Sequence, residues 1–176
     1  MIVRPATLAD LNACLCMDHA SETDHVWQMK VQEGESQVDV AFQTVRLPRR
    51  MPVAYPRNLE QLVEDWQRGE GFLAAEVDGE VAGYLDMLAN PWQQVGWVAN
   101  LAVDRAYRRK GVGTALMRHG RQWAREQGLR LLQAEATTKN YPAMAFYRKL
   151  GFQFCGFNDH YYQNQDIALF FVQNLR

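Results

Sequence analysis

The spacing of apolar and polar residues changes several times along the chain, and each spacing predicts an element. Residues 26–31 and 38–42 alternate with a period of two on either side of a glycine-containing turn at 33–36, which predicts a β-hairpin. Apolar runs at 72–77 and 81–88 flank an Asp-Gly pair, a strong signal for a second hairpin.

Helical spacing appears in four places. Thr7 is the expected N-cap of a helix that reaches about residue 19, and Asn58 that of a helix over 59–68. Apolar residues recur at helical spacing from residue 112 to the stop at Gly128, and a shorter helix is expected over 142–150. Between the first two helices, the prolines at positions 48, 52 and 56 predict irregular or extended chain.

Further apolar runs predict single strands at residues 2–4, 98–103, 129–137, 152–157 and 167–172. The order strand, helix, strand over residues 98–137 predicts a parallel pair joined by a crossover helix, flanked by antiparallel strands. We therefore expect an α/β (α+β) fold with a mixed, mostly antiparallel sheet. A chain of 176 residues suits one domain, taken as 1–176, in which residues 24–56 form a variable hairpin and loop insertion.

Composition excludes several classes of partner. The formal net charge is −1, so we expect neither nucleic acid nor an anionic membrane surface as a partner. Three cysteines make no disulfide framework, the N-terminus lacks the apolar core of a signal peptide, and no apolar run approaches membrane-spanning length. We expect a cytoplasmic protein. The four histidines show no metal-ligand spacing, so no metal is expected.

A basic, glycine-bearing loop follows the strand expected at 98–103. It reads Arg108, Arg109, Lys110, Gly111, Val112, Gly113, Thr114 and opens a helix. The first amides of a helix have no intrahelical acceptor, and the helix dipole and the basic side chains add positive charge, so this stretch suits a phosphate group. A Walker loop needs its lysine after the glycines, and a dinucleotide fingerprint needs a third glycine. What remains is R-x-x-G-x-G.

This motif, followed by Asn140 and by A-F-Y-R-K-L-G-F at 145–152, resembles the GNAT superfamily of acyl-CoA-dependent N-acetyltransferases. The resemblance covers at least residues 71–157, with both motifs in the family's order. It implies acetyl-CoA (coenzyme A) as cofactor. It also implies the GNAT fold, in which a splayed central parallel pair lies in the sheet and helices cover both faces.

The resemblance also implies roles for individual residues. The backbone of Leu101, Ala102 and Val103 would pair with the pantetheine arm as an added strand would, and the amides of residues 109–114 would hold the pyrophosphate. Asn140 would bind the cofactor arm through its side chain. Tyr147 would be the general acid that protonates the departing thiolate, although spacing alone would make it a core aromatic of an amphipathic helix.

The general base is not given by the motifs. Many relatives carry an acid on the strand at 98–103, where this chain has Ala99 and Asn100. Glu135 is the best substitute, because a carboxylate in the apolar run L-L-Q-A-E-A is costly unless it faces a cleft or a partner. A structural ion pair with an arginine is the alternative role for this residue.

A closer likeness extends over residues 135–140, 146–152, 156–157 and 167–171, which look like the streptothricin acetyltransferase branch, where the acceptor is an amino group of a cationic antibiotic. We expect direct transfer from acetyl-CoA to a primary amine of a small molecule, with residues 24–56 shaping the acceptor pocket. Two alternatives remain: a protein or peptide N-acetyltransferase, and a non-catalytic acyl-CoA-binding sensor. The sequence also leaves a homodimer open.

Overall fold

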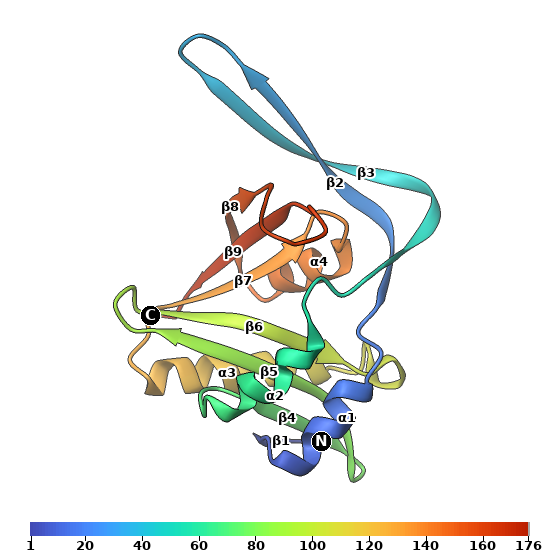
Figure 1. Ribbon diagram of the computed structural model, residues 1–176, viewed down its shortest axis with the longest axis vertical. Coiled ribbons are helices and arrows are strands. Elements are labelled where there is room, and N and C mark those ends of the chain that lie inside the picture. Colours follow the sequence, from blue (N-terminus) through green and yellow to red (C-terminus); the bar gives the residue numbers. More distant parts are fainter. Residues whose placement is uncertain (176) are drawn as a thin grey trace.

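The computed structural model describes residues 1–175, in which a seven-stranded sheet carries helices on both faces (Figure 1). The predicted domain ends at residue 176, which lies outside the described residues. The elements in chain order are β1 (Ile2–Pro5), α1 (Leu8–Cys16), β2 (Ser21–Glu33), β3 (Val38–Val53), the 3-10 turn η1 (Leu59–Gln61), α2 (Leu62–Gln67), β4 (Leu73–Val77), β5 (Glu80–Asn90), β6 (Val95–Val103), the 3-10 turn η2 (Arg105–Tyr107), α3 (Val112–Glu126), β7 (Leu131–Thr137), α4 (Tyr141–Lys149), β8 (Gln153–Asn158) and β9 (Ala168–Asn174).

The strands of the large sheet lie in the order β1-β4-β5-β6-β7-β9-β8. Only β6 and β7 are parallel among the described strand pairs, and α3 is the crossover between them. This confirms the predicted mixed, mostly antiparallel sheet with a parallel pair. The two strands pair over Val95–Trp97 and Leu131–Gln133 and then part.

A bulge in β6 lies next to the place where the parallel strands part. Asn100 lies opposite Asp86 and Val98 opposite Met87, so Ala99 is the extra residue. A bulge bends its strand and increases the local twist. Before the bulge the strands are close, since a Cβ at Gly96 would lie 2.8 Å from the side chain of Leu132. Beyond it, the β7 side of β6 is left without a neighbouring strand.

The core lies on both faces of the sheet. Leu85 and Met87 are fully buried against α3, and a Cβ at Gly120 would lie 2.6 Å from Leu85, so the helix packs very close to the strand. On the other face, α1 and α2 cover Tyr84, whose ring stacks on Phe72 at 5.6 Å. Because helices pack on both faces, the positions of β5 and β6 relative to these helices are fixed.

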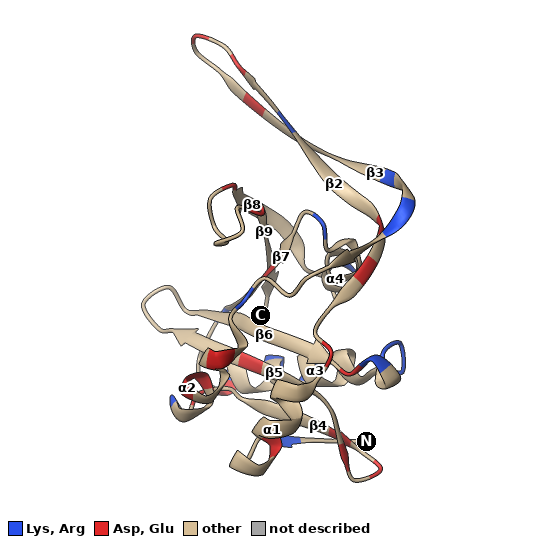
Figure 2. Cartoon of the chain, turned by 45° about the vertical axis from the view of Figure 1, so that its right-hand side comes forward, with Lys and Arg blue, Asp and Glu red and all other residues tan. Residues whose placement is uncertain are grey.

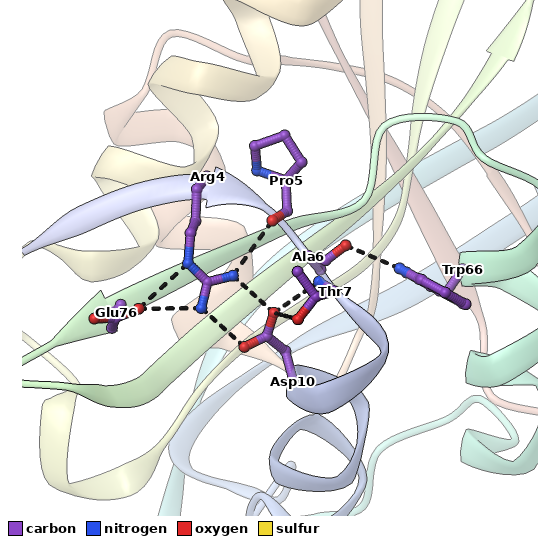
Figure 3. A network of polar contacts seen from close by, with 7 residues as sticks. All are labelled: Arg4, Pro5, Ala6, Thr7, Asp10, Trp66 and Glu76. Atoms are coloured by element: carbon purple, nitrogen blue, oxygen red, sulfur yellow. Dashed lines mark hydrogen bonds and ion pairs between the residues drawn. The ribbon is translucent and has the colours of Figure 1, made fainter.

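Helix α1 is attached to the sheet by a polar network (Figure 3). Arg4 on β1 donates to both carboxylate oxygens of Asp10, at 2.7 and 2.9 Å, and to Glu76 on β4 at 3.0 Å. Asp10 also accepts the N–H and the hydroxyl of Thr7, the predicted N-cap. The helix ends at Cys16, earlier than the predicted residue 19.

In the described chain, β2 and β3 form a two-stranded sheet of their own, which projects from the body (Figure 1). The predicted hairpin is confirmed, and of the irregular or extended chain expected at Pro48 and Pro52 the structure shows the extended form, because β3 runs to Val53. Both prolines are tolerated there since β3 is an edge strand among residues 1–175, and Pro48 falls where the ladder register shifts opposite Thr23 and His25. In residues 1–175, no helix is both long and apolar enough to cross a membrane.

Candidate active site

A cavity lies where β6 and β7 separate. Its lining comes from both strands, from α4, from the chain after β3 and from the loop before β9. The structure therefore brings together four of the predicted site residues, Leu101, Glu135, Asn140 and Tyr147. The lining residues are Tyr55, Pro56, Arg57, Val98, Ala99, Leu101, Glu135, Ala136, Thr137, Asn140, Ala143, Tyr147 and Tyr162.

The backbone of β6 offers part of one strand edge to this cavity. The N–H of Asp104 donates to the carbonyl of Ala82 at 2.9 Å, and antiparallel pairing alternates, so the groups of Ala102 face β5. Those of Leu101 and Val103 face the separation. The expectation that all three residues are available to an extended ligand is therefore corrected: Ala102 is committed to the sheet, and the Val103 carbonyl accepts from Arg108 at 2.9 Å.

The loop before α3 forms a concave set of backbone donors. Arg109 and Gly111 have left-handed backbone, with φ of 65° and 88°, and no side chain caps the helix at Gly111. The first intrahelical hydrogen bond of α3 runs from the N–H of Ala115 to the Gly111 carbonyl, at 3.0 Å. The amides of residues 112–114 are left for a ligand, and such a helix terminus favours an anion.

The three basic residues of the loop have different surroundings. The Arg108 guanidinium donates to the carbonyls of Val103, Ala20 and Asp18, so it ties the loop to the chain that leads into β2 and is not a free phosphate ligand. Arg109 and Lys110 are exposed and have no ion pair within residues 1–175. Figure 2 shows this basic loop at the start of α3. These two charges can act on a bound anion.

Asn140 is the N-cap residue of α4. Its Oδ1 accepts the N–H of Ala143 at 3.2 Å and the hydroxyl of Ser21 at 3.5 Å. Its side-chain N–H groups have no acceptor within the described residues. The side chain is held in place by its oxygen and presents donors to the cavity it lines.

Tyr147 is both a core aromatic and a cavity residue. Its ring lies against Phe146, Phe152 and Phe171, and the residue is 6% exposed. Burial raises the pKa of Tyr147 well above its ordinary value, and the negative charge of Glu135 raises it further. The phenol therefore keeps its proton at neutral pH, the state a general acid needs.

Glu135 on β7 lines the cavity, and its side chain is 5% exposed. Oε1 accepts from Arg57 at 2.7 Å and from the Tyr162 hydroxyl at 3.1 Å. Oε2 is equally buried and has no hydrogen-bond partner within residues 1–175. The ion pair with an arginine, one of the two roles weighed for this residue, is present, and the role as general base stays a prediction.

Sequence reasoning missed a second polar network beside the cavity. The Tyr55 hydroxyl donates to Asn100 Oδ1 at 2.7 Å, and Asn100 Nδ2 donates to Asp86 at 2.8 Å and to Asp65 at 3.3 Å. Burial raises the pKa of Asp86 to about 6. No motif marks Tyr55, Arg57 or the partners of Asn100, because they meet only through the fold.

Comparison with known proteins gives a family. The profile of the Acetyltransferase (GNAT) family matches residues 42–152. The chain is 38% identical over 105 residues to streptothricin acetyltransferase of Streptomyces lavendulae, which covers 57% of this chain and 56% of that protein. It is 35% identical over 109 residues to an N-alpha-acetyltransferase of Sulfurisphaera tokodaii, which covers 55% and 65%. The chain thus spans between 56% and 65% of the length of these two curated relatives.

Solved structures share the fold over nearly the whole chain. The crystal structure of nourseothricin acetyltransferase has a TM-score of 0.83 at 23% identity, with 99% and 98% of the two chains covered. A streptothricin acetyltransferase structure from Bacillus anthracis, solved in complex with acetyl coenzyme A, has a TM-score of 0.75 at 19% identity, with 98% and 96% covered. Since the family profile spans more than half of the residues, the chain belongs to the Acetyltransferase (GNAT) family, whose acetyltransferases use acetyl-CoA.

Proposed function

We propose that this chain moves an acetyl group from acetyl-CoA directly to a primary amine of a small cationic molecule, with Glu135 as the base and Tyr147 as the acid. The observation that carries the proposal is the buried, unpartnered Oε2 of Glu135 in the same cavity as Tyr147. A buried carboxylate oxygen without a donor is costly, so the site suits a ligand that brings N–H groups to it. A protonated amine is such a ligand.

The residues around the cavity fit the cofactor. Leu101 and Val103 can pair their free N–H groups with an extended amide chain, and the uncapped start of α3 can hold the pyrophosphate. Asn140 lines the same cavity, and its side-chain N–H groups have no acceptor among the described residues, so they can donate to the cofactor arm. When bound, acetyl-CoA supplies the activated acetyl group and the sulfur leaving group.

Three protons move when the acceptor binds as a protonated amine. The nitrogen loses one proton before attack, which leaves through Glu135 Oε2 to solvent, and a second as the amide forms, which Glu135 Oε2 takes up and returns to Tyr147. Glu135 suits this role because Arg57 and Tyr162 hold its other oxygen and fix the carboxylate. The departing sulfur has to gain a proton, and the Tyr147 hydroxyl carries one at neutral pH. Cysteine is absent from the cavity lining within residues 1–175, which supports direct transfer over a covalent enzyme intermediate.

The likeness to streptothricin acetyltransferase supports a small cationic acceptor, and the likeness to an N-alpha-acetyltransferase keeps a peptide N-terminus as the second candidate. Both acceptors present an amine, so the cavity carboxylate suits either. A non-catalytic sensor would have no use for a carboxylate oxygen held free beside Tyr147.

A thiol-release assay with acetyl-CoA separates these functions. The panel should contain streptothricin-type amines, aminoglycosides and peptides with free N-termini, with mass spectrometry of the products. We expect release with the cationic small molecules at rates above those for peptides. Faster transfer to peptides would replace the first candidate by the second, and binding of acetyl-CoA without release for any amine would support the sensor.

Two variants test the assigned residues. Glu135→Gln and Tyr147→Phe should each lower kcat by roughly 10²- to 10⁴-fold, the usual contribution of a positioned acid or base, while affinity for coenzyme A stays within a few-fold. Glu64→Gln removes an exposed glutamate on α2 and is the matched control. Wild-type turnover in Glu135→Gln would refute the role of this carboxylate.

A further inference from the structure

The outer part of the β2–β3 hairpin, residues 28–33 and 38–45, is called here the arm. It extends away from the seven-stranded sheet (Figure 1). Its inner end is fixed to the body: the Trp27 N–H donates to the Thr138 carbonyl at 2.9 Å, and the rings of Trp27 and Phe42 contact Phe154. A two-stranded hairpin by itself is marginally stable in water. The part of the arm beyond these contacts would therefore be stabilised by a partner surface.

Beyond Trp27 both edges of the arm are unpaired within residues 1–175, and the β2 edge carries Lys30, a residue that protects edge strands, whereas the β3 edge carries no lysine. Because the Trp27 N–H points to Thr138, the pair Trp27–Thr44 is one that exchanges no ladder hydrogen bonds. By alternation, the N–H and carbonyl groups of Thr44, Phe42 and Val40 point outward from β3. Residues 38–45, V-D-V-A-F-Q-T-V, contain no proline, lysine or bulge, the devices by which proteins protect edge strands.

One face of the arm is apolar, and its outer part, beyond Phe42, is uncovered. The register places Met29 opposite Phe42 and Val31 opposite Val40, so these side chains share a face. Val31 is 45% exposed and Val40 38% exposed. Alternation of apolar and polar side chains along a pair of strands is typical of larger antiparallel sheets in which one face is packed.

Charge along the arm indicates which partner fits. The tip carries Glu33, Glu35 and Asp39, whereas Arg46, 49 and 50 lie beyond the other end of the arm on β3. All six are exposed, and none makes an ion pair within residues 1–175. Figure 2 shows the acidic tip and the basic stretch of β3 at opposite ends. Since Phe42 lies about midway, a second arm running antiparallel would place each acidic tip beside the other's arginines.

We infer that the arm is a homodimer interface, in which β3 of one copy pairs antiparallel and edge to edge with β3 of a second copy. A two-fold axis near Phe42 generates this arrangement and makes the contact self-complementary. It gives the outward N–H and carbonyl groups of both β3 strands partners, joins the two apolar faces and pairs opposite charges. Any other partner strand would satisfy the edge but would not supply the reversed charge order.

Light scattering after size exclusion tests the inference on the whole chain. The wild type should have twice the chain mass of 20.3 kDa at tens of micromolar protein. Changing the tip acids to lysine, or the three arginines to glutamate, should give the chain mass alone, because like charges then meet. Combining both sets should restore the doubled mass. A wild type at the chain mass, or a reversed set that keeps the doubled mass, would overturn the inference, as would a combination that fails to restore it.

A second pair of variants tests edge pairing without changing charge. Thr44→Pro removes one outward N–H and leaves the β2–β3 ladder intact, so it should abolish the dimer while circular dichroism and Tm stay close to the wild type. Thr44→Ser is the matched control and should remain dimeric. A dimer that survives Thr44→Pro would contradict pairing through β3.

Discussion

Replacing Asp10 by Asn tests whether the network in Figure 3 attaches α1 to the sheet. The Asp10 carboxylate accepts two hydrogen bonds from the Arg4 guanidinium and two from Thr7. Asparagine keeps the shape and one acceptor oxygen, but it loses the charge and puts an N–H₂ group against Arg4. Arg4 then has Glu76 as its remaining ion-pair partner and still donates to the Pro5 carbonyl.

The size of the effect follows from what is lost. A hydrogen bond to a charged group contributes about 1.5–3 kcal/mol, and breaking a buried ion pair costs more. The Arg4 side chain is 33% exposed, so water screens part of the interaction. We expect a loss of about 2–3 kcal/mol in the free energy of unfolding at pH 7. For a chain of this length, this corresponds to a fall of roughly 4–12 °C in Tm.

The loss should depend on pH in a defined direction. Hydrogen bonds from the Arg4 guanidinium hold the pKa of Asp10 well below its usual range. A carboxyl with a depressed folded-state pKa stabilises the protein above its unfolded pKa of about 4, and this contribution is lost as the pH falls towards the folded value. The difference between wild type and Asp10→Asn should therefore be largest at neutral pH and should shrink below pH 4.

Urea unfolding at pH 7 and pH 3 measures both parts of this prediction. Glu80→Gln, which removes an exposed carboxylate without a hydrogen bond or ion pair among the described residues, is the control and should change stability by less than about 0.5 kcal/mol. The reasoning is wrong if Asp10→Asn matches that control at pH 7. It is also wrong if its deficit is the same at both pH values.

Three further predictions concern the sheet and the loop before α3. Leu85→Ala, in the fully buried contact between β5 and α3, should cost about 3 kcal/mol by urea unfolding, and Leu85→Met much less. Gly111→Ala meets no atom within 4 Å but strains a backbone with φ of 88°, so it should lower stability by about 1 kcal/mol and also weaken binding of coenzyme A, measured by calorimetry. Asn100→Asp should destabilise the protein more at pH 8 than at pH 5, because it sets a second carboxylate beside Asp86, whose pKa is about 6; equal losses at the two pH values would contradict this.

Elements with a local signal were predictable. The Asp78-Gly79 turn between β4 and β5 is one example: both residues have positive φ, 54° and 87°, as a two-residue hairpin of this type requires. The N-terminus of α3 is another example. Its N-cap is Gly111, which has no side chain to cap the helix, and this can be read directly from the local sequence. The confirmed parallel pair followed from the order of these elements alone.

Features that depend on distant residues were not predictable. The full length of β3 depends on its edge position, which permits Pro48 and Pro52 within the strand. The role of the Arg108 guanidinium depends on the carbonyls of Ala20 and Asp18, almost ninety residues away in the sequence. The cavity likewise receives Arg57 from the chain after the hairpin, and no spacing near Glu135 points to it.

The missing acid at positions 99 and 100 now has a physical explanation. The neighbouring strand already carries Asp86, buried and 2.8 Å from the Asn100 amide. An acid at position 100 would put two carboxylates in contact in a buried site, and one would stay protonated at neutral pH, whereas Asn100 donates to Asp86 and accepts from Tyr55. Among the residues that the structure describes, Glu135 on β7 is then the acid that lines the cavity and has one carboxylate oxygen without a hydrogen-bond partner. If this reasoning is right, Asn100→Asp will not restore turnover to Glu135→Gln, because a carboxylate at position 100 is held in the Asp86 network and away from the acceptor amine.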